Sequence, residues 1–295
     1  MDPAPPFDRR FDQRAVTIGV LLVLTAAVLW STSGIFIKVL TVNGFVLTGV
    51  RSALAFLALL PFVRWRTVRV DRNLLLLMAA FSSTQLFFVF ATRLTTAANA
   101  IALQSTAPAW VFALGVLAGR GIRVPLLLPI GMILGGIAAM LFEPASGTSL
   151  QGNLLGAASG LTFALTQIAS KRINQPAIGA VALANLASAL ICFALRPGEF
   201  QLATIGLWEW GALAYLGAIQ ISLAFVIFTV GVQRISVAQA SVLILIEPIC
   251  NPIWVYLIIA EVPSAYGFAG YGMILGGVGV DIWLRLTLPS LRQQH

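Results

Sequence analysis

The chain consists of long apolar runs separated by short polar joints. Ten runs are long enough to cross a bilayer as helices, which takes about 20 residues each: 17–40, 45–65, 73–91, 97–118, 124–142, 153–173, 178–195, 210–232, 238–259 and 265–286. The joints carry Gly, Pro, Asn or Arg, as is usual where helices end. The pattern predicts an all-α integral membrane protein with ten transmembrane helices.

Composition supports this interpretation. The residues are 59% hydrophobic and 9% charged, with a mean hydropathy of +0.95, and no soluble domain of this length could keep so much apolar surface from water. The first run is too long for a signal-peptide core and lacks a small-residue cleavage site, so we expect it to remain as the first span. Cys192 and Cys250 lie inside apolar runs without a CxxC or metal-ligand pattern, so we expect no disulfide framework and no metal.

The basic residues are distributed unevenly about the predicted spans. Fourteen lie on the even-numbered connections and the termini, against three, Lys38, Arg93 and Arg196, on the odd-numbered side. The fourteen are Arg9, Arg10, Arg14, Arg64, Arg66, Arg69, Arg72, Arg120, Arg123, Lys171, Arg172, Arg234, Arg285 and Arg292. This positive-inside bias predicts that both termini are cytoplasmic and that the net charge of +8 is a topology signal, not a nucleic-acid surface.

The chain is an internal duplication. The hexapeptide Gly-Met-Ile-Leu-Gly-Gly occurs at 131–136 and again at 272–277. Matched residues extend the repeat along both halves: Trp30 with Phe163, Lys38 with Lys171, Ser82 with Ser222, Phe88 with Phe228, and Pro108 with Pro248. We therefore predict a cytoplasmic tail (1–16), two five-helix repeats (17–144 and 145–286) and a second cytoplasmic tail (287–295). Because five is an odd number, the second repeat enters the membrane from the opposite side, an arrangement typical of transporters.

Together these features resemble the drug/metabolite transporter superfamily, and within it the ten-helix EamA type. The resemblance covers essentially the whole chain and rests on the paired halves, the Pro108 and Pro248 helices, the glycine-rich fifth and tenth helices, and Leu245-Ile246-Glu247-Pro248 leading to Ala260-Glu261. The fourth helix departs from the family pattern, because Gly119-Arg120 stands where a small residue and Glu are usual. The likeness is greatest to the YddG-type aromatic amino acid exporters, which implies export of amino acids or similar metabolites across a bacterial inner membrane, without a cofactor.

Prolines and polar residues coincide in the fourth and ninth spans. Pro108 and Pro248 each remove a helical hydrogen bond, to the carbonyls of Gln104 and Ile244, and Pro252 is expected to interrupt the ninth helix again. Broken backbone is tolerated in a membrane where protein or a water-filled cavity surrounds it. We therefore expect hinges beside a central cavity, although prolines that only bend helices for packing would leave the same pattern.

Glu247 is the most informative single side chain, because a carboxylate within a span costs on the order of 3 kcal/mol unless it is paired or hydrated. It either contacts a substrate ammonium group, exchanges a proton or, protonated or paired with an arginine, ties helices together. Arg51 is the one basic residue well inside a predicted span, where it could pair with an acid, receive a carboxylate or snorkel. Lys38 and Lys171 lie at helix ends, where solvation is the ordinary outcome. Turned inward, they would suit an anionic metabolite.

Polar and aromatic residues on the first, third, fourth, sixth, eighth and ninth spans form our candidate substrate site. Its members are Trp30, Ser33, Gln85, Phe88, Asn99, Gln104, Trp110, Phe163, Thr166, Gln167, Gln220, Phe225, Glu247 and Asn251. By contrast, we expect the glycines of the two hexapeptide helices to let helices pack closely: Gly131, Gly135, Gly136, Gly272, Gly276 and Gly277.

These features favour a secondary transporter that works by alternating access as a monomer, with a small-molecule substrate and the lipid bilayer as its partners. An enzyme explains less, because the chain has no HExxH motif, no Ser/His pair and a single histidine, His295. There is also no P-loop motif for ATP-driven pumping. The alternatives left open are a transporter of other anionic or cationic small molecules, a channel-like facilitator, and a structural or receptor-like membrane protein.

Overall fold

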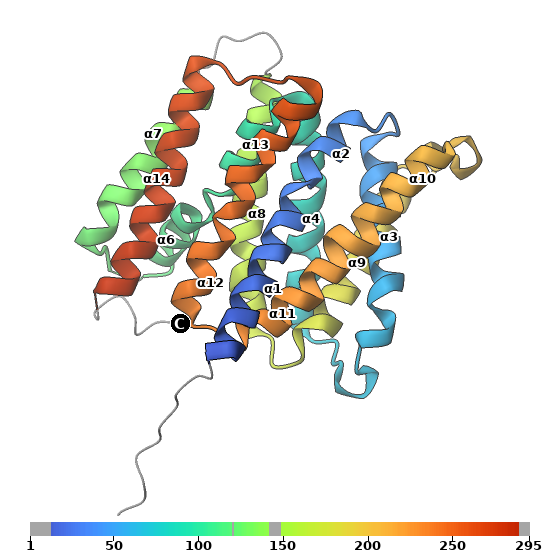
Figure 1. Ribbon diagram of the computed structural model, residues 1–295, viewed down its shortest axis with the longest axis horizontal. Helices are drawn as coiled ribbons and strands as arrows, with labels where there is room; N and C mark the ends of the chain where they lie inside the picture. Colours follow the sequence, from blue (N-terminus) through green and yellow to red (C-terminus); the bar gives the residue numbers. More distant parts are fainter. Residues whose placement is uncertain (1–12, 120, 142–148, 289–295) are drawn as a thin grey trace, which may run out of the picture.

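The computed structural model describes residues 13–119, 121–141 and 149–288, and every element in these ranges is a helix (Figure 1). The first half contains α1 (Gln13–Ser31), α2 (Ser33–Val39), α3 (Gly44–Leu59), α4 (Arg72–Leu94), α5 (Ala97–Gln104), α6 (Ala107–Leu117) and α7 (Leu127–Leu141). The second contains α8 (Leu150–Arg172), α9 (Ala177–Leu195), α10 (Leu207–Ala214), a π-helix (Tyr215–Leu223), α11 (Ala224–Val232), α12 (Val237–Ile244), α13 (Ile246–Ile259) and α14 (Ala265–Thr287).

The predicted all-α membrane fold is confirmed. In the described ranges nine helices are long and apolar enough to span a bilayer, and they match nine of the ten predicted spans to within a few residues. The tenth, α8, has 23 residues and packs along α4. It is less apolar because it carries Asn153, Thr162 and Gln167. The predicted boundary at 144/145 lies outside the described residues, as does most of each predicted tail, although α1 already begins at Gln13.

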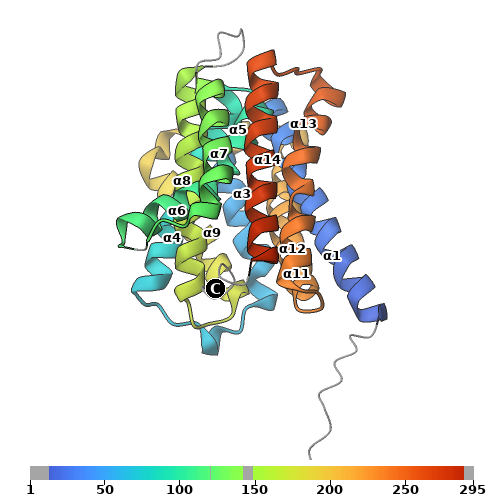
Figure 2. The same ribbon diagram turned by 90° about the vertical axis from the view of Figure 1, so that its left-hand side faces the viewer.

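The two halves are interleaved. α4 packs against α8, α3 against α9, α7 against α14, and α1 against α11, so each of these pairs joins one helix from each half. Under the repeat, the α4–α8 pair and the α1–α11 pair are counterparts of each other. The first and last described helices begin and end at the same end of the bundle, the lower end in Figures 1 and 2. We call it the terminal end.

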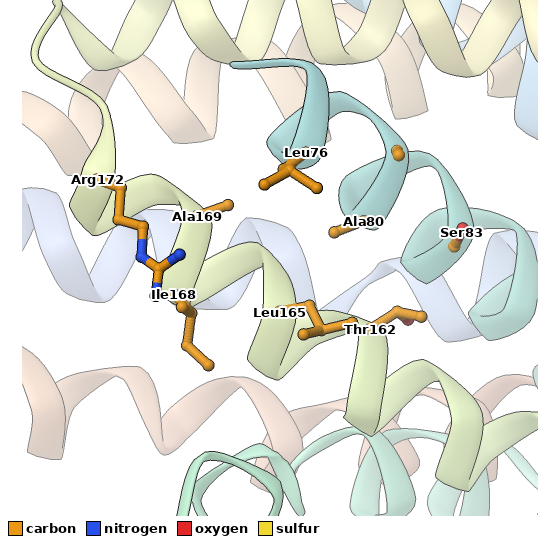
Figure 3. A pocket seen from close by; sticks show the side chains of 9 residues that line it. Leu76, Ala80, Ser83, Thr162, Leu165, Ile168, Ala169 and Arg172 are labelled. Atoms are coloured by element: carbon orange, nitrogen blue, oxygen red, sulfur yellow. The ribbon is translucent and has the colours of Figure 1, made fainter. Parts of the chain in front are cut away.

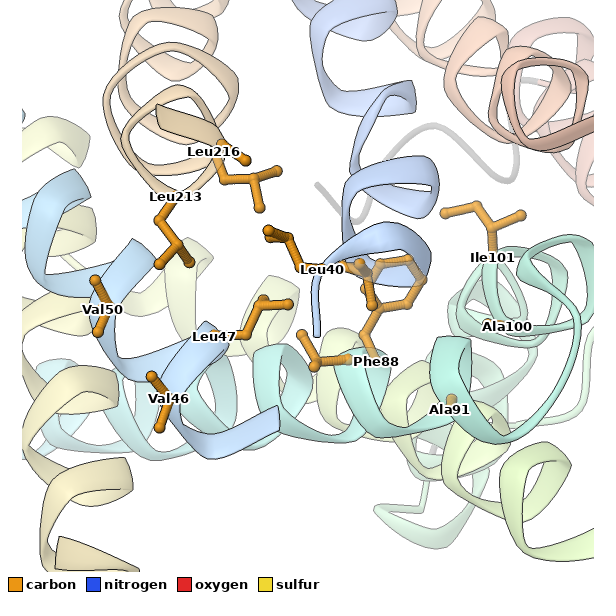
Figure 4. Packing of buried hydrophobic residues seen from close by; sticks show 13 residues of the cluster. Leu40, Val46, Leu47, Val50, Phe88, Ala91, Ala100, Ile101, Leu213 and Leu216 are labelled. Carbon is orange, nitrogen blue, oxygen red and sulfur yellow. The ribbon is translucent and has the colours of Figure 1, made fainter. Parts of the chain in front are cut away.

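The opposite end of the bundle is filled by a cluster of buried apolar side chains, which we call the apolar plug (Figure 4). It comes from α2, the start of α3, the end of α4, the start of α5, α10 and the π-helix. Its members are Ile37, Leu40, Val46, Leu47, Val50, Phe88, Val89, Ala91, Ala100, Ile101, Ala212, Leu213 and Leu216. Parts of five spans are thus in contact at this end, which we call the plugged end.

Three spans are broken near their middles. The fourth breaks between α5 and α6 and the ninth between α12 and α13, just before Pro108 and Pro248, which lie in the first turns of the following helices. Proline fits a first turn because the N–H it lacks has no helical partner there. The first span breaks at Thr32, and this break was not predicted.

Pro252 does not end a helix, contrary to the expectation from sequence. α13 continues through it. Because Pro252 has no N–H, the carbonyl of Pro248 loses its partner one turn back. The hydroxyl of Tyr271 on α14 donates a hydrogen bond to that carbonyl instead, so a side chain from the tenth span satisfies the exposed backbone group.

Candidate functional site

The break in the first span is a run of polar and small residues within an apolar helix. The Ser31 hydroxyl donates to the carbonyl of Val28 and the Thr32 hydroxyl to that of Leu29, both at 2.7 Å. Hydroxyls that bond to backbone carbonyls within the helix offer an alternative to the regular ladder. The helix therefore ends at Ser31 and restarts at Ser33, and the turn between them lies deep within the bundle.

Side chains from the eighth and ninth spans reach this break. Nε2 of Gln220 donates to the Trp30 carbonyl (3.2 Å), the Trp254 indole donates to the Ser31 hydroxyl (2.9 Å), and the Tyr215 and Thr32 hydroxyls lie 2.9 Å apart. Tyr215 and Gln220 belong to the π-helix, whose irregular backbone aims both at the first span. We call these residues, with Ser33, Glu247 and Asn251, the break site.

Asn251 is fully buried against the restart of the first span. A Cβ added to Gly34 would lie 2.4 Å from its Oδ1, so only glycine leaves room for this amide. Neither amide atom of Asn251, nor Oε1 of Gln220, has a hydrogen-bond partner among the described residues. A buried polar atom left unbonded costs about 1–3 kcal/mol. The break site therefore has hydrogen-bonding capacity that a polar solute can use.

Glu247 lies in the first turn of α13, one turn before Asn251 and two turns before Trp254. Residues four and seven apart share a helix face, so all three point toward α1 and α2, against which α13 packs. The Glu247 side chain is half-buried, and it makes no ion pair or side-chain hydrogen bond within the described ranges. The interpretation of Glu247 as an Arg-paired tie between helices is thus not what the structure shows.

Phe163 and Gln167 on α8 are exposed although they share a helix face with buried glycines. Gly156 and Gly160 lie on this face, and Gly160 is in contact with the break between α5 and α6. Phe163 is 38% exposed and Gln167 is also exposed. Both side chains thus lie one and two turns beyond the Gly160 contact and are not packed against other residues as the glycines are.

The remaining predicted site residues divide into packed and half-buried groups. Phe88 belongs to the apolar plug, and Asn99 is buried with its Nδ2 3.3 Å from Oδ1 of Asn153 and 3.4 Å from the Thr95 hydroxyl. Thr166 is buried beside Thr84, 3.4 Å between hydroxyls. Gln85, Gln104, Trp110 and Phe225 are half-buried. Of the predicted set, the break site contains Trp30, Ser33, Gln220, Glu247 and Asn251.

A second polar cluster closes the plugged end. The ammonium of Lys38 lies 2.5 Å from the carboxylate of Glu261 and 2.7 Å from the carbonyl of Thr95. The same carboxylate accepts a hydrogen bond from the backbone N–H of Ala97, at 2.7 Å. The ion pair thus joins the first span to the segment that follows the ninth. Each of its two charged groups also hydrogen-bonds to the backbone where the third span meets the fourth. We call these four residues the latch.

A surface groove between α4 and α8 lies away from the break site. It has a volume of about 300 Å³ and is lined mainly by apolar side chains, with Arg172 at one end (Figure 3). Leu165 and Thr162 of α8 face Leu76, Ala80 and Ser83 of α4 across it. None of the residues that line the groove belongs to the break site.

The hexapeptide helices pack directly on each other. A Cβ on Gly136 would lie 2.6 Å from the Gly270 carbonyl, and one on Gly277 would lie 2.8 Å from the Pro129 carbonyl. Gly135 and Gly276 face methionine side chains of the opposite helix, whereas Gly131 and Gly272 have nothing within 4 Å. The two adjacent glycines that end each hexapeptide are therefore the ones that let α7 and α14 approach closely.

Sequence reasoning missed several residues of the break site and the latch. Ser31 and Thr32 could have been found from the sequence, because the residues that follow Trp30, up to Gly34, are polar or small and interrupt an apolar span. Tyr215 and Trp254 carried none, since their positions depend on the π-helix and on the course of α13. Lys38 was expected to be solvated at a helix end, but its side chain is 14% exposed and paired with Glu261.

Comparison with known proteins agrees with this arrangement. The sequence profile of the EamA-like transporter family matches residues 17–142 and again 150–280, one match for each half of the chain. An uncharacterized transporter from Archaeoglobus fulgidus is 31% identical over 268 residues, which cover 90% of this chain and 96% of that protein. A crystal structure of a protein without a stated function has a TM-score of 0.63 at 21% identity, covering 94% of this chain and 98% of that one.

Proposed function

Because the chain belongs to the EamA-like transporter family and is a multi-pass membrane transporter, we propose that it moves amino acids, aromatic or bulky apolar ones in particular, by alternating access through the break site. The observation that carries the proposal is the convergence of Gln220, Asn251 and Glu247 on the broken first span. A transporter needs groups that bind a polar solute in the middle of the membrane, and broken helices supply them.

The chemistry of the break site suits a zwitterion with an apolar side chain. The unpaired carboxylate of Glu247 can receive an ammonium group, while the amide of Asn251 and the free N–H groups at the start of α13 can donate to a carboxylate. Trp30 lies against Phe228, with ring centroids 5.1 Å apart. Together with Tyr215 and Trp254 these rings offer an apolar surface for the rest of the solute.

The two ends of the bundle support alternating access. The plugged end is closed by the apolar plug and the latch, so a solute at the break site would exchange with the terminal end in this state. The positive-inside bias supports a cytoplasmic terminal end, and export across a bacterial inner membrane is the direction that the resemblance implies. In the other state the latch would open and the terminal end would close.

The test is counterflow into proteoliposomes loaded with a panel of amino acids, with and without a pH gradient. We expect saturable exchange of aromatic or bulky apolar amino acids. Asn251→Ala should reduce it at least tenfold, because the substitution removes both amide atoms. Asn73→Ala is the matched control, because it makes the same chemical change at the start of α4, outside the break site, and should exchange at the wild-type rate.

The outcomes separate the alternatives. No amino acid moving faster than in protein-free liposomes would overturn the substrate class, and uptake of organic cations or anions in the same assay would replace it. A steady current without saturation would indicate a channel-like facilitator. If Glu247→Gln left both the rate and its pH dependence unchanged, Glu247 would have no role in binding or proton exchange.

A further inference from the structure

Arg51 is a fully buried cation in the middle of a span. It lies midway along α3, and only 1% of its surface is exposed. The guanidinium therefore does not snorkel to either membrane surface. No acidic side chain in the described ranges lies within ion-pair distance of it, and its Nε and Nη2 have no hydrogen-bond partner there. An isolated charge inside a membrane is costly, so it needs a compensating group.

Other buried polar groups without partners lie on the same face of α3. Thr48 and Ser52 are three residues before and one after Arg51, and both are completely buried. Their hydroxyl oxygens have no hydrogen-bond partner in the described part of the chain. Thr48 is three residues before Arg51 and four before Ser52, so it shares a helix face with each, and the two hydroxyls lie side by side next to the guanidinium.

The facing helix contributes further polar groups. α9 packs along α3 and presents Asn185, Ser188 and Cys192, which are spaced three and four apart and are all buried. Cys192 lies directly against α3, because a Cβ added to Gly49, two residues before Arg51, would lie 3.2 Å from the Cβ of Cys192. Oδ1 of Asn185 is also without a partner. The described α3–α9 interface therefore encloses one cation, two hydroxyls and an amide oxygen without partners, and no carboxylate.

We propose that Arg51, Thr48 and Ser52 bind a small inorganic anion, of the size of chloride, between α3 and α9. An anion supplies the acceptor that the guanidinium N–H groups and the two hydroxyls lack. The site is closed, because each of the three residues is at most 1% exposed, which favours a monatomic ion over a solute that must enter and leave. It lies outside the break site and does not depend on the proposed substrate.

The test measures thermal unfolding of the purified full-length protein at fixed pH and ionic strength, with chloride replaced by gluconate. We expect the Tm to fall in gluconate and to rise with the logarithm of added chloride once the site is filled, because a ligand that binds only the folded state stabilises it in that way. Bromide should restore the Tm as chloride does. The exposed loop residue Arg66 is the control, and Arg66→Gln should keep the full halide effect.

Two variants locate the effect. Arg51→Met removes the charge while keeping much of the volume, a change that folded proteins often tolerate, and its Tm should be the same in chloride and gluconate. Thr48→Val keeps the guanidinium, so it should raise the half-saturating chloride concentration severalfold; this variant keeps the test decisive if Arg51→Met fails to fold.

Either of two results would overturn the proposal: a wild-type Tm that is equal in chloride and gluconate, or an Arg51→Met protein that keeps the halide effect. An aromatic amino acid that restores the Tm in gluconate where halides do not would assign Arg51 to a substrate carboxylate instead.

Discussion

The two ends of the bundle are related by the internal repeat but differ in charge. At the plugged end, Lys38 and Glu261 form the ion pair of the latch. Their counterparts in the repeat are Lys171 and, at the position matching Glu261, Arg120. An acid at one end thus corresponds to a base at the other, so the terminal end has no equivalent of the Lys38–Glu261 pair at these positions.

This difference bears on how a duplicated transporter distributes itself between its two states. Two identical inverted halves would favour neither end, because closing either would form the same contacts. Here the latch stabilises closure at the plugged end only. We therefore expect the state open toward the terminal end to be the resting state, and substrate or a partner ion to shift the population from it.

The largest effect should come from the apolar plug. Leu213 is completely buried in it, so Leu213→Ala should destabilise the plugged state by about 2–5 kcal/mol, the usual cost of a cavity in a core. Thermal unfolding in detergent measures the loss. Leu257→Ala, at a 65% exposed position on α13, makes the same change outside a core. A Leu257→Ala loss as large as that of Leu213→Ala would refute the distinction.

Breaking the latch should have the next largest effect. Glu261→Gln leaves a part-buried lysine unpaired, which we expect to cost on the order of 2 kcal/mol, or about a 30-fold rise in the population open at the plugged end. The readout is the labelling rate of Ala91→Cys, in the plug, by a membrane-impermeant thiol reagent in a Cys192→Ala/Cys250→Ala background. The charge swap Lys38→Glu/Glu261→Lys keeps the ion pair but loses both backbone hydrogen bonds, so it should slow the labelling only in part. Labelling of the swap as fast as that of Glu261→Gln would argue against a contribution from the ion pair.

A smaller effect is expected at Tyr271, whose hydroxyl covers the Pro248 carbonyl in the ninth span. The counterpart of Pro252 in the fourth span is Phe112, so this device exists in one half only. Tyr271→Phe should destabilise the protein by about 1–2 kcal/mol. In Tyr271→Phe/Pro252→Ala the restored N–H supplies the missing donor, so the loss should shrink. Equal losses in thermal unfolding with and without Pro252→Ala would contradict the account.

The smallest effect concerns the terminal end. Arg120→Glu puts an acid at the position that matches Glu261 in the repeat. An exposed ion pair contributes about 0.2–1 kcal/mol, and a pair at the terminal end would stabilise its closure. We therefore expect at most a fewfold increase in Ala91→Cys labelling relative to the Ala91→Cys/Cys192→Ala/Cys250→Ala background, in the same direction as the Glu261→Gln effect but smaller. Arg123→Glu makes the same charge change nearby and serves as the control. If the two substitutions changed the labelling rate equally, the effect would come from net charge and not from a specific ion pair.

Sequence predicted the spans of this fold well and the centre of the candidate site only in part. Apolar runs of about 20 residues leave little freedom in where helices begin and end, because the bilayer sets their length. Pro108 and Pro248 likewise marked two breaks, since a missing N–H is visible in sequence. The break at Thr32 depends on hydroxyls bonding to carbonyls, which Ser and Thr in spans often do without breaking a helix.

The π-helix and the latch could not be predicted in this way. The π-helix has no residue signature, and it aims Tyr215 and Gln220 at the first span only because the chains pack as they do. The latch joins residues far apart in sequence, and Lys38 alone is indistinguishable from a solvated helix-end lysine. Phe88 shows the opposite error. The sequence suggested it for the substrate site because it is aromatic, but in the structure it packs in the apolar plug.

The most direct test of the central claim, that the two ends open in alternation and the latch holds one of them closed, is a pair of spin-label distance measurements. One pair, Leu94→Cys and Val262→Cys, reports on the plugged end, and the other, Leu117→Cys and Gln233→Cys, reports on the terminal end. In Glu261→Gln the first distance should gain a longer component while the second gains a shorter one. Two unchanged distributions, or two that lengthen together, would contradict alternating closure.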